Sequence, residues 1–166
     1  MSKRGWIGLA ALAAVLLAGT TAVAFSGGDE EQSPWPKGVV EAKPAGATQV
    51  DVVMSEWAII PDRDSVKAGT VYFLVENRGP NDPHEFVVIR TDGEPGELPV
   101  IQGRVPEDEL DMVDEIHPYR PKTTASIALD LAPGKYALIC NVAEVEDGEI
   151  ESHYELGMYA AFTVTP

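Results

Sequence analysis

The chain has 166 residues, of which 45% are hydrophobic, and it carries a formal net charge of −15. This length suits one domain plus an export segment, and the hydrophobic content excludes disorder along the whole chain. A surface this acidic excludes nucleic acid as a partner, because phosphates require Lys and Arg, and it favours basic proteins or cations instead.

The first 25 residues have the pattern of an export segment. Lys3 and Arg4 precede an uncharged run that is rich in Ala and Leu and ends near Ala22-Val23-Ala24. This small-x-small ending suits cleavage by a signal peptidase. The run is also long enough to span a bilayer, for which about 20 residues suffice. Residues 1–25 are therefore predicted to be a signal peptide, which we favour, or an N-terminal membrane anchor. Both interpretations place the rest of the chain in the periplasm or outside the cell.

Residues 26–47 contain Gly, Pro, Ser, Gln and acidic residues without an apolar period, which predicts a flexible linker. The remaining residues, 48–166, form one predicted domain. In this domain, runs of β-branched and aromatic residues alternate with turns that contain Gly or Pro, a pattern typical of an all-β fold. About seven or eight short strands of this kind predict a β-sandwich. The strand-like runs cover residues 50–54, 57–60, 65–70, 71–77, 85–90, 122–131, 135–140 and 159–164.

A short helix is predicted near residues 106–116. Pro106 suits the first position of a helix, and three acidic residues follow it directly, as they do in many first helical turns. Apolar residues then recur at every third position through Ile116, which indicates an amphipathic helix. His117 lies at the end of this predicted helix, so we interpret it as a structural residue and leave it out of the candidate site.

Cys140 is the only cysteine in the chain, so no intramolecular disulfide can form and a hydrophobic core must hold the fold. Buried free cysteines are common and often only fill space. In an exported protein, however, an unpaired thiol is open to oxidation. A soft metal bound to the thiolate would explain an isolated cysteine at the end of a strand. Cys140 is therefore a candidate metal ligand, with a buried structural thiol as the alternative.

Three further residues complete a candidate copper site. His153 and Met158 follow Cys140 in the connection between the last two strands, and His84 precedes the strand at 85–90. One end of a sandwich can bring these residues together. Two imidazoles, a thiolate and a weak thioether are the donor set of an electron-transfer copper site. Such a set offers no evident position for a substrate, and no hydrolase or phosphate-binding motif stands out, so we expect no enzymatic activity.

The segments around these residues resemble the cupredoxin family, the relatives of plastocyanin, azurin and sulfocyanin. Residues 134–141, GKYALICN, and residues 153–164, HYELGMYAAFTV, are similar to the closing motif of the family, and residues 66–79 are similar to its opening strands. The resemblance begins near residue 48 and extends to the C-terminus. It implies a Greek-key β-sandwich, one-electron transfer and a type 1 site with one copper ion. The implied ligands are His84, Cys140, His153 and Met158.

The spacing between Cys140 and His153 departs from the family pattern. Twelve residues, 141–152, lie between them, and five of these are acidic, whereas most family members have only a few residues here. An insert of this length can loosen His153. We interpret it as a solvated loop or as a docking patch for a basic redox partner, and we disfavour a calcium site because the acids do not follow the EF-hand spacing. Glu85 stands where many relatives carry Asn, which makes Asn141 a candidate for the missing hydrogen bond near the site.

Three functional hypotheses follow from these observations. The favoured one is a monomeric electron carrier whose copper cycles between Cu(I) and Cu(II). Its partner would be a basic redox protein that docks on the acidic surface, or a protein that contacts exposed apolar residues such as Leu156 and Tyr159. The second is a periplasmic module that stores or delivers copper, for which an adjustable insert would ease metal exchange. The third is a metal-free sandwich that acts as an adhesion or interaction module.

Overall fold

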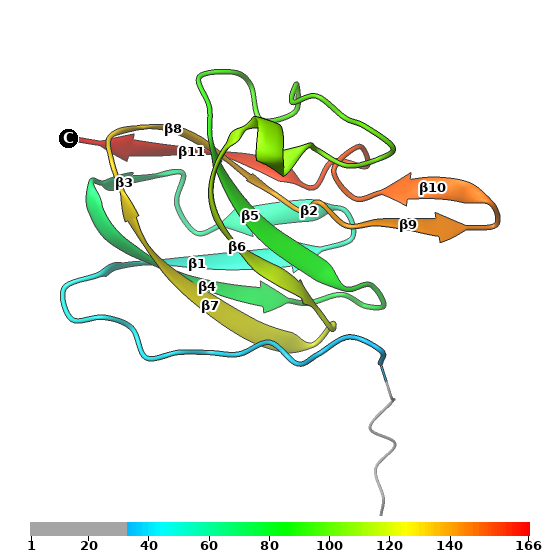
Figure 1. Ribbon diagram of the computed structural model, residues 1–166. Helices are drawn as coiled ribbons and strands as arrows, with labels where there is room; N and C mark the ends of the chain where they lie inside the picture. The colour runs from blue at the N-terminus through cyan, green and yellow to red at the C-terminus, as the bar shows by residue number, and fades with distance from the viewer. Residues whose placement is uncertain (1–32) are drawn as a thin grey trace, which may run out of the picture. The chain divides into compact units, whose positions relative to one another are not determined.

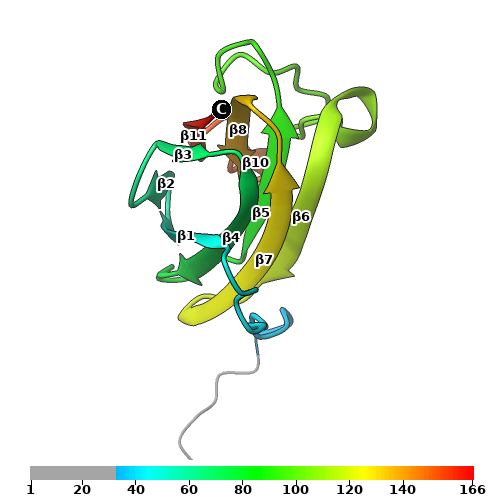
Figure 2. The same ribbon diagram turned by 90° about the vertical axis from the view of Figure 1, so that its left-hand side faces the viewer.

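The computed structural model describes residues 33–166, which form a β-sandwich (Figure 1). One sheet has four strands in the order β2-β1-β4-β7, the other has five in the order β3-β11-β8-β5-β6, and β9 and β10 form a separate hairpin. Figure 2 shows the two larger sheets packed face to face. The strands are β1 (Thr48–Ser55), β2 (Ala58–Pro61), β3 (Ser65–Lys67), β4 (Gly69–Asn77), β5 (His84–Arg90), β6 (Asp111–Tyr119), β7 (Thr123–Leu131), β8 (Gly134–Ile139), β9 (Ala143–Glu146), β10 (Glu149–Ser152) and β11 (Tyr159–Thr165).

Alternating apolar residues place the core between the two sheets. In β4, Val71, Phe73 and Val75 are fully buried, as expected for the inward face of a strand with a period of two. β4 pairs in parallel with β1 and antiparallel with β7, while β8 lies between β11 and β5 in the second sheet. Phe73 packs against Phe86 from the opposite sheet at a ring-centroid distance of 5.3 Å. The predicted all-β sandwich is confirmed.

β5 is buried on both faces and separates two hydrophobic clusters. Phe86 and Val88 belong to the main core between the sheets, whereas Val87 and Ile89 belong to an outer cluster. The excursion at 91–110 covers this outer cluster with apolar side chains. Neighbouring residues of β5 therefore face two different environments on the two sides of one sheet.

The predicted helix at 106–116 is wrong. Only Glu107–Glu109 form a 3-10 turn, η1, and the chain then enters β6, which pairs with β5. A register shift between Val88 and Ile89 interrupts the regular alternation of this pair, so apolar residues of β6 pack on both faces of the sheet. Met112 packs on the outer cluster and Ile116 against the main core. The three-residue period thus reflects an irregular strand, because pairing with β5 outweighs local helix signals.

Part of the expected linker lies along β7 and the connection that precedes it. Backbone hydrogen bonds join Arg120 N to Pro36 O at 2.9 Å and Ser126 N to Val39 O at 3.0 Å. A Cβ added to Gly38 would come within 2.4 Å of the Thr124 carbonyl oxygen, so only glycine allows this close approach. Residues 36–39 are therefore held against the sandwich (Figure 1). The predicted export segment, residues 1–25, lies outside the described residues. Within residues 33–166, no helix is both long and apolar enough to cross a membrane.

Candidate metal centre

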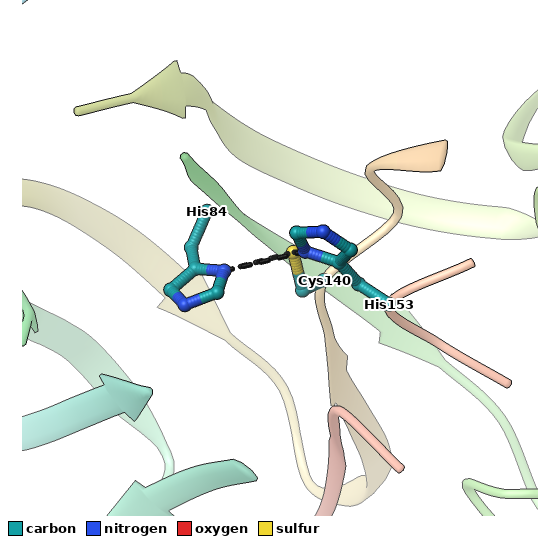
Figure 3. Close-up of side chains that lie close together, drawn as sticks. All are labelled: His84, Cys140 and His153. Carbon is teal, nitrogen blue, oxygen red and sulfur yellow. Dashed lines mark hydrogen bonds between the residues drawn. The ribbon is translucent and has the colours of Figure 1, made fainter. Parts of the chain in front are cut away.

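Three metal-ligating side chains meet at one end of the sandwich. His84 is the first residue of β5, Cys140 directly follows β8, and His153 directly follows β10. The antiparallel pairing of β5 with β8, in which Val87 lies opposite Ile139, brings the first two of these positions together. Figure 3 shows the imidazole rings of His84 and His153 directed toward the Cys140 sulfur.

The distances among the three donors fit a single ion. His84 Nδ1 lies 3.3 Å from His153 Nδ1, and Cys140 Sγ lies 3.4 Å from His153 Nδ1 and 3.9 Å from His84 Nδ1. Donors that share one ion lie roughly 3.3–3.8 Å apart when metal–nitrogen bonds are about 2.0–2.1 Å and metal–sulfur bonds about 2.3 Å. Two of the three distances fall in this range, and the distance from Cys140 Sγ to His84 Nδ1 is slightly longer. These distances show that the Nδ1 side of each ring faces the other donors. The Nε2 atom of each ring is buried and has no hydrogen-bond partner among the described residues.

Burial keeps all three donors uncharged in the absence of a cation. None of their side chains is exposed to solvent. Burial lowers the pKa of His84 to about 4, and burial together with the neighbouring His84 ring lowers the pKa of His153 to about 4. Burial also raises the pKa of the Cys140 thiol to about 12. Neutral imidazoles are the form that binds metals, and a cation beside the sulfur would favour the thiolate.

Backbone N–H groups are directed at the Cys140 sulfur. Glu85 N donates to Sγ at 3.3 Å, and the Val142 backbone N–H also acts on the thiol and favours its ionised form. These donors stabilise negative charge on sulfur. The Asn141 amide does not reach the sulfur, because it exchanges hydrogen bonds of 2.7 and 2.9 Å with the backbone of Val105. The hydrogen bonds to the sulfur therefore come from the backbone N–H groups of Glu85 and Val142, and not from the Asn141 side chain that the sequence suggested.

A compact turn joins His153 to Met158. Met158 N donates to His153 O at 3.0 Å, and Gly157 N donates to Tyr154 O at 3.0 Å. Gly157 has a φ of +115°, a conformation that favours glycine. Met158 is fully buried in the main core, and its carbonyl accepts a hydrogen bond from Cys140 N at 3.0 Å. The backbone therefore holds Met158 beside both Cys140 and His153.

The loop before His84 is fixed by a buried asparagine. Asn77 Nδ2 donates to the carbonyl oxygens of Asp82 and Tyr119 at 3.0 and 3.1 Å, and Asn77 Oδ1 accepts from Gly79 N at 2.8 Å. Asn77 is fully buried, so these bonds replace the contacts that its amide loses with water. They fix the turn that leads into β5 and with it the position of His84.

A tryptophan that the sequence analysis did not place at the site covers His153. The Trp57 ring meets the His153 ring edge-on, with centroids 4.8 Å apart and an interplanar angle of 64°. Trp57 lies in the connection between β1 and β2, more than 90 residues before His153 in the chain. No local signal in the sequence links the two rings. Trp57 is half-buried and separates His153 from solvent on this side.

The long insert between Cys140 and His153 forms the β9–β10 hairpin. The two strands pair from Ala143 with Ser152 to Glu146 with Glu149. At the base, His153 N donates to Val142 O at 3.0 Å, and Ser152 Oγ donates to Gly103 O at 2.6 Å. The insert thus returns the chain to the site in a fixed register, and His153 is not loosened by it. Figure 1 shows the hairpin extending away from the two sheets.

The comparisons with solved structures identify auracyanins as structural neighbours. The auracyanin of Roseiflexus castenholzii matches with 22% identity and a TM-score of 0.53 over 73% of this chain and 100% of its own. Auracyanin A of Chloroflexus aurantiacus, described as a "blue" copper protein, matches with 21% identity and a TM-score of 0.54 over 72% and 100%. Auracyanin B matches with 20% identity and a TM-score of 0.52 over 81% and 100%.

No protein-family model and no curated protein matches the chain. At 20–22% identity the structural likeness concerns the fold, and it agrees with the resemblance seen in the sequence around Cys140 and His153. The chain therefore has the cupredoxin fold, with two imidazoles and one thiol gathered at one end of its β-sandwich.

Proposed function

We propose that this protein is an electron-transfer protein that holds one copper ion through His84, Cys140, His153 and Met158. The observation that carries the proposal is the convergence of two imidazole Nδ1 atoms, 3.3 Å apart, on one thiol sulfur at 3.4 and 3.9 Å. Two imidazoles and a thiolate with a weak thioether are the donor set of electron-transfer copper sites. The presence of a "blue" copper protein among the structural neighbours also supports it.

The residues of the site suit a role without catalysis. When bound, the copper ion supplies the one-electron couple between Cu(II) and Cu(I). The chain holds His84 through β5, Cys140 through β8 and His153 through the base of the β9–β10 hairpin, which limits movement of the ligands when the oxidation state changes. Because His84, Cys140 and His153 are fully buried, water and small substrates are kept away from the donors. Such a fixed and covered site favours electron exchange over substrate chemistry.

The storage or delivery hypothesis loses the feature that favoured it. It depended on an adjustable ligand loop between Cys140 and His153. The insert instead forms paired strands whose base is closed by the hydrogen bond from His153 N to Val142 O. A fixed register of this kind does not ease metal exchange, so we retain the electron-carrier proposal.

The proposal includes an exported protein and a basic redox partner. The β9–β10 hairpin, whose last residue directly precedes His153, carries Glu144, Glu146, Asp147, Glu149 and Glu151. Acidic groups on this hairpin would attract a basic protein and orient it for electron exchange. The predicted export segment at residues 1–25 supports a location in the periplasm or outside the cell.

Repeated redox cycling tests this proposal against copper storage. Residues 25–166 are loaded with one equivalent of Cu(II), reduced with ascorbate and reoxidised with ferricyanide over ten cycles, and the copper content is measured after gel filtration. An electron carrier should keep its copper and recover its visible spectrum in each cycle. Loss of copper on reduction would favour storage or delivery, and failure to bind Cu(II) would refute the copper site.

A further inference from the structure

A second group of metal-ligating side chains lies on the outer face of the five-stranded sheet. It consists of Glu85 from β5 and of Glu115 and His117 from β6, and one ligand atom from each lies within 4.8 Å of the others. Val87 is paired with Glu115 and His84 with Tyr119, so this register places Glu85 beside the stretch that contains Glu115 and His117. The proposed copper site makes no use of these three side chains.

The burial of Glu85 is the feature that points to a ligand. Glu85 is only 6% exposed, and the group that faces its carboxyl is another carboxyl, that of Glu115. The charge of the nearby Arg104 guanidinium acts on Glu85 and opposes the rise of its pKa, but the Arg104 N–H groups donate to the carbonyl oxygens of Asn141 and Ala143. A buried carboxylate is stable only when a proton or a cation compensates its charge. Two carboxylates that face each other can share one cation.

The third member of the group adds a nitrogen donor on the solvent side. His117 Nδ1 lies 3.2 Å from Glu115 Oε1, and the His117 side chain is 82% exposed. An exposed imidazole can turn toward an ion without disturbing the core. Glu85 and Glu115 also line a surface cavity of about 650 Å³, which gives a hydrated ion access to the carboxylates.

We propose that Glu85, Glu115 and His117 bind a divalent transition-metal ion, for which Zn²⁺ is the representative probe. Imidazole nitrogen and carboxylate oxygen are donors that Zn²⁺ uses, and three protein ligands leave one position for water. An imidazole in the set disfavours Mg²⁺ and Ca²⁺, which prefer oxygen donors. This site is separate from the copper site and lies on the other face of the same sheet.

Glu85 links the two sites directly. Its carboxylate belongs to the outer site, while its backbone N–H donates to Cys140 Sγ at 3.3 Å. A cation on the carboxylate would add positive charge close to the thiolate and would favour the reduced state of a bound copper ion. This consequence rests on the proposed function, whereas the Zn²⁺ site itself does not.

Equilibrium dialysis against Zn²⁺ tests the site. The experiment uses the Cys140→Ser background, which removes the thiolate of the other site. Glu115→Gln and His117→Ala should each reduce the number of bound Zn²⁺ ions by one. Asp114→Asn is the matched control, since it removes the same charge from the adjacent exposed position of β6 and should leave the number unchanged. An equal loss in Asp114→Asn, or no loss in His117→Ala, would overturn the proposal; the latter variant changes only an exposed side chain and should fold normally.

The midpoint potential of the copper-loaded protein tests the link through Glu85. Zn²⁺ should raise the potential of the wild type and of Asp114→Asn and should leave Glu115→Gln and His117→Ala unchanged. An equal shift in all four proteins would refute the link and indicate nonspecific screening. If the protein binds no copper, the dialysis experiment still decides the Zn²⁺ site, so the two proposals fail independently.

Discussion

The Trp57 ring lies edge-on against the His153 ring at a centroid distance of 4.8 Å. His153 has no exposed surface, so Trp57 is part of what closes the site toward solvent. The sheets position the donors, and this aromatic contact from a distant part of the chain covers one of them.

Replacing Trp57 should open the site without removing a ligand. In Trp57→Ala we expect copper to bind with the same stoichiometry but to pass to a competing chelator several-fold faster than in the wild type. The lost packing should also lower the free energy of unfolding by about 2–3 kcal/mol, less than for a fully buried aromatic residue. Trp57→Phe keeps an aromatic cover and is the control. Equal chelator rates in all three proteins would show that Trp57 does not shield the site.

Asn77 should be a principal stabilising residue of the loop before His84. Asn77→Ala removes three hydrogen bonds and leaves the carbonyl oxygens of Asp82 and Tyr119 without this donor. We expect the free energy of unfolding to fall by about 2–4 kcal/mol, as measured by urea denaturation of the metal-free protein. Asn81→Ala, at an exposed position of the same loop, should change it by less than about 0.5 kcal/mol. Similar values for the two variants would contradict the assigned role of Asn77.

Glu85 should make stability depend on pH. Burial, reinforced by the Glu115 carboxyl, raises the pKa of Glu85 from 4.5 to about 8. The folded state therefore keeps this proton at pH values where the unfolded state has released it. The stabilisation of the folded state by this bound proton is fully present below pH 4.5 and is lost as the pH rises through about 8. Glu85→Gln should thus gain stability relative to the wild type between pH 5 and pH 8, on the order of a few kcal/mol.

Urea denaturation of the two metal-free proteins at several pH values measures this difference. His84 and His153 act in the opposite direction, since their lowered pKa values reduce stability as the pH falls from about 6.5 toward 4. This contribution is common to both proteins and cancels in the comparison. A stability difference that does not change with pH would refute the role of the Glu85 carboxyl.

The outer part of the β9–β10 hairpin should be dispensable for metal binding. The strand pairing of residues 144–151 is confined to the hairpin itself, while Ala143 and Ser152 hold the base. Replacing 144–151 by Asn-Gly, a pair that favours a two-residue hairpin turn, should therefore leave the copper spectrum unchanged. It should also slow electron exchange with a basic partner such as cytochrome c at low ionic strength, because the acidic residues are lost. Loss of copper binding would show that the hairpin is needed to position His153.

The sequence was sufficient to predict the sandwich and to nominate the donors. Strands such as β4 and β8 have clear alternating or apolar runs between Gly and Pro turns, and Cys140 is chemically distinctive as the only cysteine. The structure brings His84, Cys140 and His153 together, as the spacing predicted. Their role as copper ligands remains the proposal to be tested.

Features that depend on contacts between distant segments were not predictable. β6 was mistaken for a helix because a register shift in its pairing with β5 hides the alternation of a strand. The same error placed His117 at a helix end, whereas it lies on an exposed face beside Glu115. The cover by Trp57 depends on tertiary packing that no local pattern encodes.

The visible spectrum of the copper-loaded protein tests the central claim most directly. Residues 25–166 are mixed with one equivalent of Cu(II), and the wild type is compared with Cys140→Ser. We predict an intense thiolate-to-copper band in the wild type that is absent in the variant, because Cys140 Sγ lies 3.4 and 3.9 Å from the two imidazole Nδ1 atoms that would share the ion. A wild-type spectrum without this band, or one that Cys140→Ser reproduces, would contradict the assignment of a type 1 copper site.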